Sequence, residues 1–174
     1  GSIIAGVNNP PVASDRWDSI IYKIKKESDN SRTVQKIYTL SGNYGEYIAD
    51  VKATQDGGII FGGWYFSTSI EGKSEGEENK FNFAGGDDLN PKGYVIKLNK
   101  NNELEYTNTF YGSRYNNETN NENKFIGVTS VAESNRKIIS GGFFATSDLS
   151  VATYDKDANE KNKDEKNLIE WSGN

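Results

Sequence analysis

The chain has 174 residues, of which 34% are hydrophobic, and it carries 25 Asp and Glu against 20 Lys and Arg. It contains no Cys, Met or His, which excludes disulfides, thiol nucleophiles and imidazole bases or metal ligands. The acidic balance argues against a nucleic-acid partner, because such partners bind basic surfaces. No apolar run approaches the roughly 20 residues that span a bilayer, so no membrane insertion is expected.

The first predicted strands lie in the segment 18–67. The stretches SIIYKIKKE (19–27), VQKIYTLSG (34–42) and EYIADVKAT (46–54) are rich in β-branched and aromatic residues, and polar turn residues separate them. The stretch IIFGGWYF (59–66) follows after TQDGG, whose Asp-Gly step supplies the positive φ angles of a tight hairpin. We therefore predict four short antiparallel strands in this segment.

The same pattern recurs later in the chain, with Lys97 of GYVIKLNKN aligned on Lys23. Its strands follow in the same order, and no window has helical spacing of apolar residues. Residues 153–155 align with residues 97–99 at the start of a further copy. Residues 1–174 are thus predicted to be a single all-β repeat domain or a segment of a larger array of such repeats. The predicted divisions are a partial repeat 1–8, a repeat 18–67, an insertion loop 68–92, a repeat 93–147 and a partial repeat 150–174.

Two Gly-Gly pairs, Gly62-Gly63 and Gly141-Gly142, occupy the same place in the two copies. Paired glycines inside a strand indicate a bulge, or the close approach of a neighbouring backbone or ring. A phosphate-binding loop is the weaker interpretation, because no predicted helix follows the glycines to present its N-terminus.

These motifs resemble the β-propeller-type repeat of secreted and surface-attached bacterial proteins. The matching positions are Lys97, Leu98, Leu104, Tyr106, Gly112, Asp56, Gly57, Gly58 and Gly63. The second copy departs from the pattern at Asn102, where a hairpin glycine is expected, and at residues 135–137, where Asn-Arg-Lys replaces Asp-Gly-Gly. The resemblance implies four-stranded antiparallel, propeller-like units and carries no shared catalytic residues; a β-sandwich is the alternative fold.

The stretch TQDGGIIF (54–61) also resembles the Asp-box hairpin of sialidases and other propellers. In those proteins the motif is a structural turn away from the active site. The match at Thr54, Asp56, Gly58 and Phe61 therefore indicates fold rather than glycosidase chemistry.

Candidate metal ligands occur in GGDDLNPKG, where the oxygens of Asp87, Asp88 and Asn90 fit Ca²⁺; a solvated turn is the stronger interpretation, and no other cofactor is expected. The acidic segment 155–165 begins like a calcium-binding loop. Glu160 stands where that loop needs glycine, and Lys166 stands where it needs a bidentate Glu. Nothing among the carboxylates singles out a catalytic pair.

The candidate ligand-binding residues are aromatic: Trp64 and Tyr65 after the first Gly-Gly, and Phe81 and Phe83 in the insertion 68–92. Aromatic rings can stack on sugars, and a loop of this length is either functional or disordered. The alternative is that the rings after Gly-Gly belong to the core.

The expected function is a non-catalytic structural or adhesive module of a bacterial cell surface. Its expected partners are a glycan or a host or cell-surface protein, together with self-association or continuation in a longer chain. The alternative is a fragment of a glycan-active propeller enzyme.

Overall fold

The computed structural model describes residues 2–9, 17–68, 70–75, 81–83, 91–111, 126–144 and 149–155. Within them every regular element is a β-strand, which confirms the all-β prediction. None of these residues forms a helix long and apolar enough to cross a membrane. The strands are β1 (Ser2–Asn9), β2 (Asp18–Lys26), β3 (Arg32–Gly42), β4 (Glu46–Ala53), β5 (Ile59–Tyr65), β6 (Ile70–Ser74), β7 (Phe81–Phe83), β8 (Lys92–Leu98), β9 (Leu104–Tyr111), β10 (Ile126–Ser134), β11 (Lys137–Phe144) and β12 (Ser150–Asp155).

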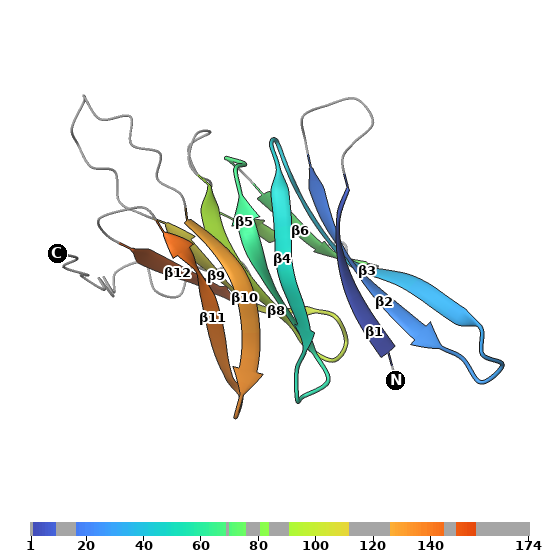
Figure 1. Ribbon diagram of the computed structural model, residues 1–174. Coiled ribbons are helices and arrows are strands. Elements are labelled where there is room, and N and C mark those ends of the chain that lie inside the picture. Colours follow the sequence, from blue (N-terminus) through green and yellow to red (C-terminus); the bar gives the residue numbers. More distant parts are fainter. Residues whose placement is uncertain are drawn as a thin grey trace, which may run out of the picture.

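The strands form two five-stranded sheets and one hairpin (Figure 1). The first sheet has the order β1-β2-β3-β6-β7, the second has the order β4-β5-β8-β9-β12, and β10 pairs with β11. All the named strand pairs are antiparallel. The described strands close into neither a barrel nor a ring.

The predicted strands occur, but the sheets group them differently from the sequence repeats. The second sheet joins β4 and β5, from the end of one sequence copy, to β8 and β9, from the start of the next. The chain changes sheet between β3 and β4, through the short turn 43–45. The four neighbouring strands β4, β5, β8 and β9 therefore begin two strands later in the chain than the predicted repeat, which contains β2 to β5.

In each five-stranded sheet a later strand of the chain pairs with the second strand of a hairpin, β2–β3 or β8–β9. β6 pairs with β3, and β12 pairs with β9. The alignment of residues 153–155 with residues 97–99 predicts β12 as the counterpart of β8, whereas its pairing makes it the counterpart of β6. Likewise, the segment 68–92 contains the strands β6 and β7 as well as connections.

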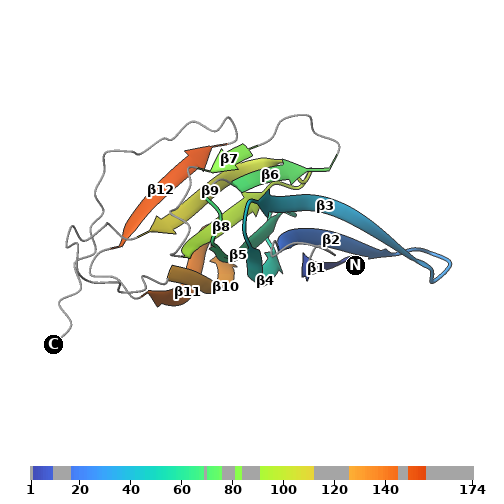
Figure 2. The same cartoon turned by 90° about the horizontal axis from the view of Figure 1, so that it is seen from above.

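The two five-stranded sheets and the hairpin form three layers (Figure 2). Two apolar clusters hold the layers together. Ile21, Leu40 and Phe61 belong to the larger cluster, which joins the two five-stranded sheets. Ile60, Val95, Val128 and Val131 form the smaller cluster, which joins the second sheet to the β10–β11 hairpin. The alternating sequence of β8 predicts one buried face and one face open to solvent. Both faces of β8 are buried, because the β10–β11 hairpin covers the face that was expected to be solvated.

The Gly-Gly pairs face matching bulges, as the sequence predicts. In β4–β5 the register shifts between Ile48 and Asp50, which pair with Gly63 and Gly62. In β10–β11 it shifts between Val128 and Ser130, which pair with Gly142 and Gly141. A Cβ on the second glycine of each pair would collide with a backbone carbonyl, that of Tyr47 or of Gly127. The bulge therefore requires glycine at the same place in both copies.

Candidate functional site

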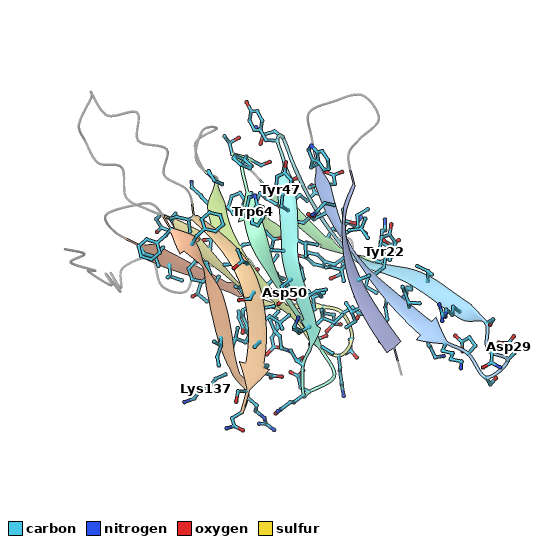
Figure 3. All side chains as sticks on the ribbon, viewed as in Figure 1. Tyr22, Asp29, Tyr47, Asp50, Trp64 and Lys137 are labelled. Carbon is cyan, nitrogen blue, oxygen red and sulfur yellow. The ribbon has the colours of Figure 1, made fainter. Side chains whose placement is uncertain are left out.

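A row of aromatic rings crosses the layers near one end of the strands; we call Trp17, Tyr47, Trp64, Phe66 and Phe143 the aromatic row. Tyr47 stacks on Trp17 at a centroid distance of 6.0 Å. It also stacks on Trp64 at 5.6 Å, and these two residues are labelled in Figure 3. Phe66 meets Tyr47 edge-on at 6.0 Å, and Phe143 meets Trp64 at 6.1 Å. The row thus links Trp17, which directly precedes β2 of the first sheet, with rings of the second sheet and of the hairpin.

Backbone contacts fix the rings of the row. The Glu46 N–H donates to the Trp17 carbonyl at 2.7 Å, and Trp17 forms an isolated parallel bridge with Gly45. The Phe66 N–H donates to the Gly45 carbonyl at 2.9 Å. Asn43 donates its side-chain amide to Thr68 Oγ1 at 2.9 Å and accepts the Thr68 N–H at 3.0 Å. The turn between β3 and β4 therefore holds the chain on both sides of the row.

Glycine shapes the hairpin end of the row. Gly127 pairs with Phe143, at the position where Tyr47 pairs with Trp64. A Cβ on Gly127 would lie 2.6 Å from the Phe143 ring, so the ring lies over the glycine. The missing side chain gives Phe143 room to lean across β10.

The two predicted residues at the end of β5 have different environments. Trp64 is half-buried and takes part in the row. Tyr65 is 1% exposed and belongs to the core between the two five-stranded sheets. Successive side chains of a strand point to opposite faces, so these neighbours cannot both serve one platform. The burial of Tyr65 favours the core interpretation for that residue.

The remaining predicted site residues lie elsewhere. Phe81 and Phe83 are in β7, which pairs with β6 at the edge of the first sheet, whereas Trp64 is in the second sheet. The predicted calcium ligands Asp87, Asp88 and Asn90 lie outside the described residues. Among the residues that the structure does describe, no three carboxylates gather in a metal-binding arrangement.

The Asp-box-like hairpin is built around Asp56. Its Oδ1 accepts hydrogen bonds from Thr54 Oγ1 at 2.5 Å and from the Gly58 N–H at 2.9 Å. The ammonium of Lys97, whose side chain is 4% exposed, lies 2.8 Å from Asp56 Oδ2 and 3.3 Å from Glu105 Oε2. The Lys97 hydrogen bonds, then those from Thr54 and Gly58, hold the pKa of Asp56 well below its usual value. These contacts give the carboxylate a structural use.

A buried acid lies beside the backbone that holds the row. Glu46 is fully buried; its Oε1 accepts a hydrogen bond from Ser67 Oγ, and its Oε2 has no hydrogen-bond partner. Burial raises the pKa of Glu46 to about 8, and the negative charge of Asp18 acts in the same direction. At neutral pH the Glu46 carboxyl therefore keeps its proton.

Tyr47 and Glu46 are not among the site residues that the sequence predicts. EYIADVKAT reads as an ordinary strand, and nothing in it shows that its first two side chains enter the row and the core. The repeat contains one usable signal: Trp64 follows the bulge-forming glycines, and Tyr47 is the residue that faces it across the pair. Rings on cross-strand partners lie close enough to stack.

Comparison of the chain with protein-family models, curated proteins and solved structures gives no match. The aromatic row and the layered β architecture are therefore the observations on which a functional proposal rests.

Proposed function

We propose that the chain is a non-catalytic, extracellular β-repeat module of a bacterial surface protein that binds a glycan on its aromatic row. The continuous row of rings carries this proposal. The apolar C–H face of a sugar ring packs on an aromatic ring. Tyr47 is stacked between Trp17 and Trp64, so the ring surface open to sugars lies at Trp17, at the outer part of the half-buried Trp64 and at Phe143. Trp17 and Phe143, at the two ends of the row, are 38% and 44% exposed.

The layered repeat supports the structural part of the proposal. The second sheet and the β10–β11 hairpin present Trp64 and Phe143 at equivalent places in their strands, because the bulge opposite Gly-Gly recurs. We infer that the layers are consecutive units of a propeller-like stack, either continued in a longer chain or completed by association of copies. The resemblance to repeats of secreted and surface-attached proteins supports the extracellular location.

A titration against immobilised oligosaccharides, followed by calorimetry on the best ligand, tests glycan binding. We expect Trp17→Ala and Trp64→Ala each to weaken binding by about tenfold or more, since each removes a stacking ring. Ile139→Ala is the matched control, because it removes an exposed apolar side chain outside the row. Unchanged affinity in the Trp17→Ala/Trp64→Ala double variant, or no binding by the intact chain, would contradict the proposal.

A glycan-active enzyme is the second candidate, and Glu46 is the observation in its favour. A carboxyl that keeps its proton at neutral pH is what a general acid needs. Its complete burial separates it from any ligand on the row, which favours binding over catalysis. Turnover of a glycoside panel by the intact chain, lost in Glu46→Gln, would reverse this choice.

A further inference from the structure

The outer edge of β11 lacks a strand that its counterpart has. β5 and β11 occupy equivalent places, since each pairs through Gly-Gly with a bulged strand. β5 pairs with β4 on one side and with β8 on the other. β11 pairs with β10 and with no other described strand. Its second edge therefore presents a row of backbone donors and acceptors that can template a further strand.

An apolar hollow lies beside this edge and has a volume of about 190 Å³. Its lining includes Phe110, Ile126, Ser140, Phe144, Leu149 and Phe143, the last ring of the aromatic row. Ser140 pairs with Val131 as Phe61 pairs with Val51, so a small residue stands where the first copy has a large ring. In the first copy Phe61 is fully buried and packs against Tyr94 of β8 at 6.2 Å. The hollow thus lies beside β11 at the position that the side chains of Phe61 and Tyr94 occupy beside β5.

The side chains around the edge are unusually exposed for apolar residues. Ile139 is 58% exposed and Phe144 is 46% exposed. Their counterparts Ile60 and Tyr65 are buried, because β5 lies between β4 and β8 in a sheet that is covered on both faces. The second copy therefore carries the apolar side chains of a central strand at a position where the described chain supplies no neighbour.

We propose that the edge of β11 binds an extended strand of the β8 type, supplied by another copy of this repeat. The added strand runs antiparallel to β11, as β8 does to β5. In β5–β8 the aromatic Tyr94 pairs with Gly63, so the equivalent ring of the added strand pairs with Gly142. There it enters the apolar hollow. Backbone pairing supplies affinity and the ring supplies specificity, as in other cases of strand addition. The proposal rests on the repeat architecture and not on glycan binding.

A fluorescent peptide with the sequence of residues 91–99, PKGYVIKLN, titrated into the intact chain tests the proposal. We expect saturable binding at one site, weakened about tenfold or more by Tyr94→Ala in the peptide. Two N-methylated peptides provide the sharpest test, one modified at Tyr94, Ile96 and Leu98 and the other at Gly93, Val95 and Lys97. Alternate N–H groups of a strand point to opposite edges, so one modified set should abolish binding and the other should preserve it.

Two variants of the protein separate this site from the glycan row. Phe144→Ala removes a wall of the hollow and should weaken peptide binding about tenfold without changing glycan affinity. Trp17→Ala, at the end of the row away from the hollow, should do the opposite. Absence of saturable peptide binding, or equal effects of the two N-methylated sets, would overturn the strand-addition proposal while leaving glycan binding intact. The peptide series decides the matter even where Phe144→Ala lowers stability.

Discussion

The ammonium of Lys97 in β8 lies 2.8 Å from Oδ2 of Asp56, in the turn between β4 and β5, and so ties two hairpins of the second sheet together. Lys97 is almost completely buried, whereas Asp56 is half exposed. The charge of the lysine is therefore removed from most of the solvent, and Asp56 is the closest group that compensates it.

Asp56→Asn is expected to lower the free energy of unfolding by about 2 kcal/mol near neutral pH, because it leaves a buried cation with a weaker partner. The pKa of Asp56 is lowered on folding, so this carboxylate stabilises the fold above the unfolded value of 3.8 and loses its effect as pH falls below it. The difference between the two proteins in urea denaturation should shrink towards pH 3. Glu105→Gln, which removes the more distant carboxylate, should cost less; a larger cost would contradict the assignment.

Gly142→Ala is expected to destabilise the fold by about 3 kcal/mol, because the new Cβ would meet the Gly127 carbonyl across the bulge. Gly141→Ala is the matched control: its Cβ meets only Ser130 Oγ, at 2.8 Å, and a hydroxyl can rotate away. Thermal unfolding of both variants measures the difference. Equal losses of stability in Gly141→Ala and Gly142→Ala would show that the close approach across the bulge is not what requires glycine here.

Local chemistry made several features predictable. Asp-Gly in TQDGG predicts the hairpin between β4 and β5, and Gly57 there has a φ of 85°. Asn102 replaces the expected hairpin glycine and has a φ of 67°, a conformation that Asn tolerates better than most residues. Gly-Gly predicts the bulges. Each of these signals acts within one hairpin, so the sequence alone contains it.

Sheet membership was not predictable in the same way. Whether β4 joins β3 or begins a new sheet is decided by the turn 43–45 and by the packing of whole layers. Alternation in β8 suggested one solvated face, but the β10–β11 hairpin covers it, and Lys97 is accommodated there by its partners. The aromatic row was only partly predicted. Trp17 and Tyr47 are distant in the sequence and meet only because two layers pack together.

Arg136→Gly is expected to stabilise the fold by about 1 kcal/mol. Asn135 and Arg136 form the two-residue turn between β10 and β11, with φ values of 50° and 63°. Turns of this type favour Asn followed by Gly, because a Cβ makes the left-handed conformation costly. The midpoint of thermal unfolding should rise by roughly 2 to 4 °C. Asn135→Gly should change it much less, since Asn adopts this conformation more readily; a drop with Arg136→Gly would contradict the strain argument.

Glu46→Gln is expected to remove a pH dependence of stability that the intact chain shows between mildly acidic and alkaline conditions. Burial raises the pKa of Glu46 from 4.5 to about 8 on folding, so the folded state holds this proton more tightly than the unfolded state. The stabilisation is fully present below pH 4.5 and is lost as pH rises through about 8. At about 1.4 kcal/mol for each pKa unit, the free energy of unfolding should fall by several kcal/mol over this interval. Urea denaturation at pH 5 and pH 9 measures the fall. Glu46→Gln should remove most of this fall in the free energy of unfolding and should be the more stable protein at pH 9. The exposed control Glu103→Gln should show the same fall as the intact chain. A Glu46→Gln variant that loses as much stability between pH 5 and pH 9 as the intact chain would show that another group is responsible.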